Sequence, residues 1–144
     1  MKKEVLLTIN GKHRERGADW DGMEVMTTGT LYEKENALYL IYDEVMGEDT
    51  EDVSHNRIKI EQDPLTITMT KSGAVASIMS FAENIKEKSS YETPYGSLLM
   101  EIDTKEIQFE NQEDRMYLRI RYNLEMNYEP LSESDISIEA KTVM

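Results

Sequence analysis

The stretch "RMYLRIRYNLEM", Arg115 to Met126, decides the fold class of this chain. Apolar side chains occupy every second position, and mainly polar or charged side chains stand between them. The apolar face of this two-residue period consists of Met116, Leu118, Ile120, Tyr122, Leu124 and Met126. A strand with one apolar face is half-buried, so the stretch predicts a β-strand that covers a core.

The same period recurs along the chain on both sides of this strand. It is clear in "EVLLTI" (4–9), "PLTITMTK" (64–71) and "SLLMEIDT" (97–104). Turn-forming residues separate such runs: Asn10-Gly11, Asp21-Gly22, Glu35-Asn36, Gln62-Asp63-Pro64, Ser72-Gly73 and Pro94-Tyr95-Gly96. Helical periodicity is strong nowhere, and "SFAENIKEKSS" (80–90) predicts a loop or one short helical turn.

These runs predict an all-β protein of eight to ten antiparallel strands, forming one domain over residues 1–144. So many strands with one apolar face each must close into a barrel or stack as a sandwich. Short connections between consecutive strands favour a single antiparallel up-and-down β-barrel.

The composition excludes several classes of function. The formal net charge of −13 disfavours binding to nucleic acid or to anionic membrane surfaces. The chain has no cysteine, which removes disulfides, thiolate chemistry and cysteine-bound metals and suits a reducing compartment. No segment approaches the ~20 apolar residues of a membrane span, and no secretory signal is recognisable. We therefore expect a cytoplasmic protein.

No catalytic or metal-binding motif is present in the sequence. The two histidines, His13 and His55, stand in no metal-ligand spacing, and no serine has the context of a catalytic nucleophile. The acidic stretch "DWDG" (19–22) lacks the rest of a calcium loop and is expected to be a turn. We predict no enzyme activity, no bound metal and no cofactor.

Glu44 is the carboxylate with the most informative position. It shares a strand face with Leu38, Leu40 and Tyr42, so it is either partly buried near the barrel mouth or lies past the last buried position. Arg119 and Arg121 lie opposite the apolar face of their strand, where we expect them to pair with acidic residues of neighbouring strands.

Methionine is the one compositional excess, with 10 residues in 144. A methionine-lined interior suits varied apolar ligands, although methionine on an apolar strand face is more often simple core filling. The residues expected at a ligand site in the barrel interior and rim are Tyr42, Glu44, Met69, Tyr91, Tyr95, Met100 and Tyr122. In "YETPYG" (91–96), the turn itself is the main expectation, and two tyrosines at a barrel mouth are the alternative.

Four stretches in order carry a family resemblance: "MTTGTLYEKENALYLIYDEV", "LTITMTKSGAVASIMSF", "YETPYGSLLMEIDT" and "MYLRIRYNLEM". Over about residues 3–140 the chain resembles the YwiB-like family of bacterial proteins of unknown function. The resemblance implies a small barrel near the lipocalin-like, or calycin, group, and it implies no activity. Lys71 stands where relatives often have arginine, so it cannot reproduce a planar guanidinium.

Two hypotheses of function follow, and a third, an enzyme that would use Glu44 and a tyrosine, ranks behind both. The first is a barrel that binds a small apolar or amphipathic molecule, with tyrosine hydroxyls orienting its polar part. The alternative is a protein-interaction or structural module, such as a homodimer, that has no ligand. Its exposed patch would include Tyr32, Tyr39, Ile41 and Tyr117.

Overall fold

The computed structural model describes residues 2–15, 17–45, 53–73 and 76–143, with the backbone alone described at 45 and 89–93. The described residues form ten strands and no helix. The strands are β1 Lys2–Glu15, β2 Asp21–Lys34, β3 Ala37–Val45, β4 Val53–Glu61, β5 Thr66–Gly73, β6 Ala76–Phe81, β7 Lys86–Thr93, β8 Gly96–Asn111, β9 Arg115–Met126 and β10 Glu129–Thr142. The all-β prediction is confirmed.

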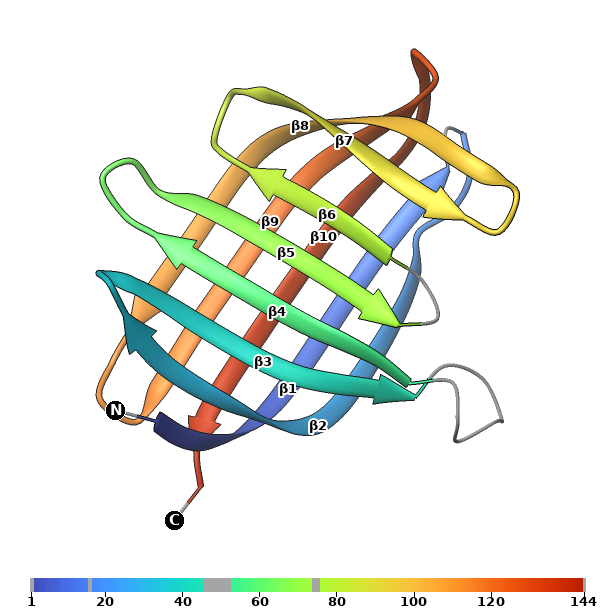
Figure 1. Cartoon of the computed structure of the whole chain (residues 1–144). Helices are drawn as coiled ribbons and strands as arrows, with labels where there is room; N and C mark the ends of the chain where they lie inside the picture. Colours follow the sequence, from blue (N-terminus) through green and yellow to red (C-terminus); the bar gives the residue numbers. More distant parts are fainter. Residues whose placement is uncertain (1, 16, 46–52, 74–75, 144) are drawn as a thin grey trace.

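Each strand pairs antiparallel with its neighbours in the sequence, and β1 pairs with β10 to close the barrel. Figure 1 shows this up-and-down order, with β1 beginning and β10 ending at the same end of the barrel. The predicted up-and-down barrel is therefore confirmed. Closure gives every strand a paired neighbour on both sides, and removing the free sheet edges in this way prevents edge-to-edge association.

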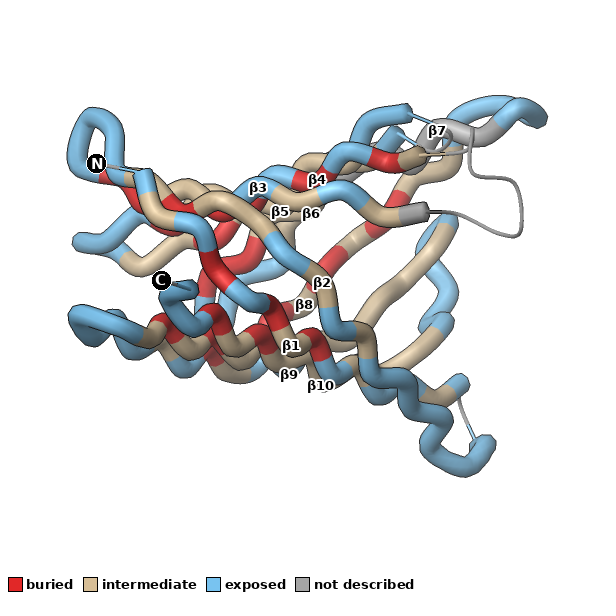
Figure 2. Tube along the Cα trace, turned by 90° about the horizontal axis from the view of Figure 1, so that it is seen from below, coloured by how far each residue is buried: buried red, intermediate tan, exposed pale blue. Residues whose placement is uncertain are grey.

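The inner face carries the alternating apolar side chains. Val5, Leu7 and Ile9 of β1 share one buried cluster with Leu118 and Ile120 of β9 and with residues of the facing strands. Figure 2 shows buried stretches on β1, β9 and β10 and, across the interior, on β3 and β4. The core thus lies between two facing walls of one continuous sheet.

The hairpins use the backbone conformations that their turns require. Glu35 and Asn36 join β2 to β3 with φ of 51° and 66°, the left-handed values that a tight hairpin turn needs. Gly96 follows Pro94 and Tyr95 at the β7–β8 connection with φ of 122°, which suits glycine. The turn predicted in "YETPYG" is confirmed.

Two sequence-based expectations were wrong. The dipeptide Asn10-Gly11 is not a turn, because it lies inside β1, where Asn10 pairs with Glu24 on one side and Ser137 on the other. The stretch predicted as a loop or helical turn (80–90) is a loop only at 82–85, and its last five residues begin β7, which pairs with β8 over its full length. In both cases pairing with long neighbouring strands overrides the local preference.

Candidate functional site

Polar side chains occupy one end of the inner surface, on strands β3 to β6. The register aligns Tyr42 with Asn56, Asn56 with Lys71, and Lys71 with Ser77. These positions have the same parity as the buried Leu40 and the other core residues of their strands, so they lie on the inner face. A row of polar residues therefore crosses four neighbouring strands inside the barrel.

The next inward-facing row adds a carboxylate and a hydroxyl. Glu44 of β3 aligns with Ser54 of β4, and Ser54 aligns with Gly73 of β5. We call Tyr42, Glu44, Ser54, Asn56 and Lys71 the polar cluster. Glu44 is half-buried, so the first of the two expectations for this carboxylate is confirmed.

One ion pair joins the two charged members of the polar cluster. Lys71 Nζ donates a hydrogen bond to Glu44 Oε1 at 3.1 Å. The exposed fractions of the two side chains are 30% and 28%, so both are substantially withdrawn from water. The pair balances its charge within the cluster, which lowers the cost of holding either charge at this depth.

Two buried polar atoms of the cluster have no hydrogen-bond partner among the described residues. They are Ser54 Oγ and Asn56 Nδ2, on residues with exposed fractions of 0% and 9%. An unsatisfied buried polar group costs about 1–3 kcal/mol, and native proteins hold few of them. Such groups lie where a bound molecule could supply the missing partner.

The tyrosine hydroxyls of the interior stay protonated at neutral pH. Burial, with a smaller contribution from the negative charge of Glu44, raises the pKa of Tyr42 to about 12. Burial also raises the pKa of Tyr122 on the opposite wall, against a hydrogen bond with Ser134 that lowers it. Each hydroxyl can therefore donate a hydrogen bond.

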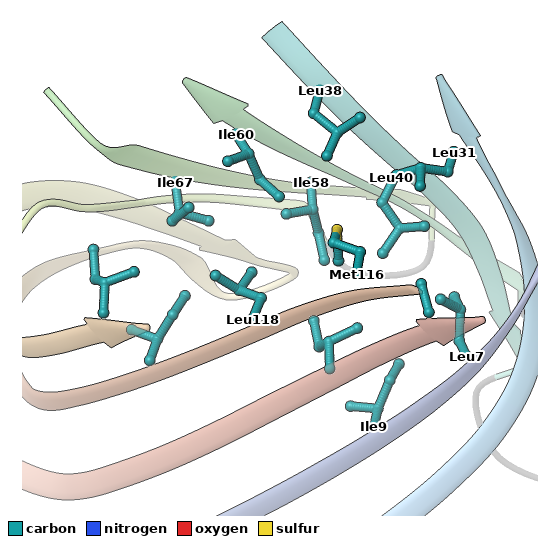
Figure 3. Close-up of a cluster of buried hydrophobic side chains, with 14 of the residues drawn as sticks. Leu7, Ile9, Leu31, Leu38, Leu40, Ile58, Ile60, Ile67, Met116 and Leu118 are labelled. Carbon is teal, nitrogen blue, oxygen red and sulfur yellow. The ribbon is translucent and has the colours of Figure 1, made fainter. Parts of the chain in front are cut away.

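Apolar side chains continue directly from the polar cluster. In the next inward row Met69 aligns with Ile58 and Met79, and both methionines pack against the buried core. Figure 3 shows Leu38, Leu40, Ile58, Ile60 and Ile67 pointing into the interior toward Met116 and Leu118. The inner surface is therefore amphipathic, with a polar end and an apolar end.

A pocket of about 490 Å³ opens where β2 separates from β3. The two strands pair from Thr30 with Ile41 to Lys34 with Ala37, and no pairing continues beyond Thr30. Inward-facing Gly29 and Tyr42 and outward-facing residues such as Thr28 both line the pocket. The pocket therefore lies in the barrel wall at this separation, and Tyr42 is the member of the polar cluster that lines it.

Gly29 and Gly73 lie next to the polar cluster, at two points where neighbouring strands approach each other closely. A Cβ on Gly29 would lie 2.6 Å from the backbone oxygen of Ile41 and 3.3 Å from Cβ of Tyr42. A Cβ on Gly73 would collide with the backbone oxygen of Val53, and the φ of Gly73 is 114°. Any larger residue at position 29 would push β2 away from β3 at the pocket.

The structure brings three of the predicted site residues together. Tyr42 and Glu44 belong to the polar cluster, and Met69 lies in the adjoining apolar row. Met100 is buried in β8, and Tyr122 packs against Phe81 with ring centroids 4.9 Å apart.

The two tyrosines of "YETPYG" differ in position: Tyr95 lies at a turn, and the backbone of Tyr91 lies beside Ser77 of the polar row. Tyr95 is fully exposed at the β7–β8 turn. The backbone of Tyr91 pairs with Ser77 and Leu98, and its side chain lies outside the described residues.

Ser54 and Asn56 were missed by sequence reasoning. The stretch "VSHNRIKI" (53–60) does indicate their position, because Ser54 and Asn56 lie on the same face of the strand as Ile58 and Ile60. Polar residues that extend an apolar face toward one end of a strand indicate that the inner surface becomes polar there.

The outer face carries ion pairs and aromatic contacts. Arg119 pairs with Asp135 and Arg121 with Glu106, which confirms the outward pairing predicted for both arginines. The rings of Tyr32 and Tyr39 stack with centroids 5.0 Å apart. Tyr117 lies on β9, which β10 and β1 separate from β2, so it is not part of that aromatic pair.

The described part of the chain carries neither a metal-binding cluster nor a membrane-spanning helix. No group of three or more His, Cys, Asp or Glu residues there is arranged to hold a metal ion. Within the same residues, no helix is long and apolar enough to cross a membrane.

Fold and inner surface together define an all-β, antiparallel up-and-down barrel with an amphipathic interior. The chain belongs to the family described as "Domain of unknown function (DUF1934)", whose model matches residues 7–138.

Comparisons with individual proteins agree with this membership. The chain is similar to the "Uncharacterized beta-barrel protein YwiB" of Bacillus subtilis (strain 168), with 26% identity over 130 residues that cover 90% of this chain and 88% of that protein. It also superposes on the crystal structure of the ywiB protein from Bacillus subtilis with a TM-score of 0.84. That match covers 99% of this chain and 94% of the other at 22% identity, and it shows the shared fold. The resemblance to the YwiB-like family is confirmed.

Proposed function

We propose that the barrel binds one small amphipathic molecule. Its polar end would contact the polar cluster, and its apolar part would lie along Met69, Met79 and the neighbouring core residues. The observation that carries this proposal is the pair of buried, unpartnered polar atoms, Ser54 Oγ and Asn56 Nδ2, beside a half-buried ion pair. A bound polar group would offset the cost of these atoms.

Access for the ligand is supported by the pocket at the β2–β3 separation. Its volume of about 490 Å³ lies within the range of small-molecule sites, which are commonly about 300–1,000 Å³. Tyr42 lines the pocket and belongs to the polar cluster, so it connects the two. A molecule bound there would be open to solvent on one side and would contact Tyr42 on the other.

The setting that we propose for this activity is the cytoplasm, because a chain without cysteine suits a reducing compartment. We also propose a relation to the lipocalin-like, or calycin, barrels, on the shared antiparallel up-and-down closure. The net charge of −13 argues against nucleic acid or an anionic membrane as the partner. Fold alone does not identify a ligand, so the proposal depends on the polar cluster.

Native mass spectrometry of protein purified from its own cells tests the proposal. We expect a mass above that of the chain, which returns to the chain mass under denaturing conditions. Lys71→Met should reduce the ligand-bound fraction, whereas Lys59→Met, on the outer face of β4, should leave it unchanged. A native mass equal to the chain mass, with no chemical-shift change on adding cell extract to labelled protein, would contradict ligand binding.

The alternative function, an interaction module that forms a homodimer, has one supporting observation. The stacked Tyr32 and Tyr39 rings lie on the outer face with cations above them: Lys2 at 5.6 Å from the Tyr32 centroid, and Arg57 and Lys59 at 5.8 Å from that of Tyr39. Aromatic and arginine side chains are enriched in protein interfaces. Sedimentation of the wild type and of Tyr39→Ser separates the two functions, because only the module requires self-association through this face.

A further inference from the structure

We infer that the polar end of the ligand is an uncharged group that accepts hydrogen bonds, such as the carbonyl oxygen of an ester, an amide or a ketone. This inference rests on the proposed function and adds the chemical class of the ligand. It follows from two properties of the polar cluster: its charges are already balanced, and Asn56 Nδ2, a buried atom that can only donate, has no partner among the described residues.

The charge balance disfavours an ionic head group. Lys71 and Glu44 are the only charged members of the polar cluster, and they pair with each other at 3.1 Å. A carboxylate or an ammonium group added to this site would be a third charge, and one charge would be left without a partner in a partly desolvated site. The net charge of −13 adds a further penalty for an anion.

The unpartnered side-chain N–H groups of Asn56 favour a ligand group that accepts hydrogen bonds. Asn56 Nδ2 carries two N–H bonds and, like Ser54 Oγ, has no partner within the described part of the chain. The ammonium of Lys71 has three N–H bonds, of which one points to Glu44. The Tyr42 hydroxyl remains protonated and able to donate. A carbonyl oxygen has two lone pairs and can accept from two of these groups at once.

The arrangement of rows also fixes the direction of the ligand. Asn56 and Lys71 lie one inward row from Ile58 and Met69, and the row beyond contains Ile60 and Ile67. A carbonyl at Asn56 therefore places an attached hydrocarbon chain beside the half-buried Met69 and Met79, because Ile60 and Ile67 are already fully buried. Burying each methylene of that chain contributes about 0.8 kcal/mol, which provides affinity while the head group provides selectivity.

A matched ligand series tests the inference on the wild-type protein. Methyl decanoate, decanamide, decanoate and decylamine share one chain and differ in the head group. Isothermal titration calorimetry should give dissociation constants at least about tenfold lower for the ester and the amide than for the two ions. Tighter binding of decanoate or of decylamine would overturn the inference while leaving the proposed function in place. Failure of all four to bind would count against the proposed function itself.

Variants connect the selectivity to the named atoms. Asn56→Leu removes the unpartnered donor and should weaken methyl decanoate binding by about tenfold, with Ser54→Ala giving a smaller loss. Thr68→Val is the matched control, because Thr68 lies on β5 beside Met69 but faces outward. Unchanged ester affinity in a folded Asn56→Leu protein would overturn the inference. If that variant does not fold, the wild-type series and Ser54→Ala still decide the outcome.

Discussion

Lys71 on β5 and Glu44 on β3 form an ion pair across the strand that lies between them. Lys71 aligns with Asn56 of β4 and Glu44 aligns with Ser54, two residues away, so the 3.1 Å contact runs diagonally over the inner face of β4. The two side chains of β4 beneath it are the ones whose polar atoms lack partners. The ion pair therefore satisfies its own charges and leaves the residues between them available.

This ion pair is expected to contribute to folding stability. Lys71→Met and Glu44→Gln should each lower the free energy of unfolding, because each leaves the other charge partly buried without a partner. The double variant should lose less than the sum, with a coupling free energy of about 1 kcal/mol. Urea denaturation of the four proteins measures it.

A more exposed ion pair supplies the matched control for this cycle. Lys86 and Glu125 approach to 3.3 Å, but the Lys86 side chain is 53% exposed. Lys86→Met with Glu125→Gln should therefore show a coupling free energy under about 0.5 kcal/mol. Equal couplings for the two pairs would show that the partial burial of Lys71 and Glu44 has no energetic consequence.

Gly29 is expected to be essential for the path of β2 beside the pocket. Gly29→Ala places a Cβ 2.6 Å from the backbone oxygen of Ile41, so the strands must move apart. We expect a loss of about 2 kcal/mol or more in the free energy of unfolding. Thermal and urea denaturation measure the loss.

The control is the same substitution at Gly11, which also lies within a strand. No atom lies within 4 Å of a Cβ at Gly11, so Gly11→Ala should be neutral or slightly stabilising because it restricts the unfolded chain. Similar losses of unfolding free energy at both positions would mean that replacing any strand glycine destabilises the barrel. The loss at Gly29 would then not result from the close approach of β2 to β3.

The fold could be predicted from the sequence because each strand has one face in the core. Alternating apolar side chains predict most of the strands, but the alternation is less clean in β6 and is absent from the β7 stretch "KEKSSYET" (86–93). Strand β7 forms by pairing with β8. Backbone pairing does not require apolar side chains in β7, so it leaves no periodic signal in the sequence of β7. The turn predicted at Asn10-Gly11 was wrong for a related reason. Pairing with β2 on one side and β10 on the other holds this turn-forming dipeptide in an extended conformation.

The candidate site could be predicted only in part. Glu44 and Tyr42 were visible because they extend an apolar face along a single strand. The pairing of Glu44 with Lys71 depends on the register of β3, β4 and β5, which no single stretch contains. The pocket depends on where β2 leaves β3, a property of barrel curvature that alternation does not encode.

Acid is expected to weaken the outer-face pair of Arg119 and Asp135. Nε and Nη2 of Arg119 donate to the two carboxylate oxygens at 3.0 and 2.7 Å, and this bonding holds the pKa of Asp135 below its usual value, against a smaller opposing effect of burial. A lowered folded-state pKa contributes stability above the unfolded value, and this contribution is lost as the pH falls through the lowered pKa. The pair should contribute about 0.5–1 kcal/mol at neutral pH.

The comparison of wild type with Asp135→Asn over an acid pH series measures this effect. The stability difference should be largest near neutral pH and should shrink as the pH falls. Arg119→Lys keeps the positive charge but loses the two parallel hydrogen bonds, so it should show part of the same loss. A difference that stays constant into strong acid would show that the carboxylate makes no pH-linked contribution.

Alkali is expected to destabilise the barrel through Tyr42. Its pKa is raised to about 12 in the folded protein, by burial first and by Glu44 second, from an ordinary value of about 10. A raised folded-state pKa contributes stability that is fully present below the unfolded value, and this contribution is lost as the pH rises from about 10 to about 12. The linked free energy is about 2–3 kcal/mol at most.

Tyr42→Phe isolates this contribution, because phenylalanine keeps the ring and cannot ionise. Wild type should lose more stability than Tyr42→Phe between about pH 9 and about pH 11, as measured by urea denaturation at each pH. Tyr122, whose pKa burial also raises, remains in both proteins, so its effect cancels in the comparison. Parallel losses in the two proteins would mean that Tyr42 ionises as readily in the barrel as in the unfolded chain, and that this end of the interior is as wet as bulk solvent.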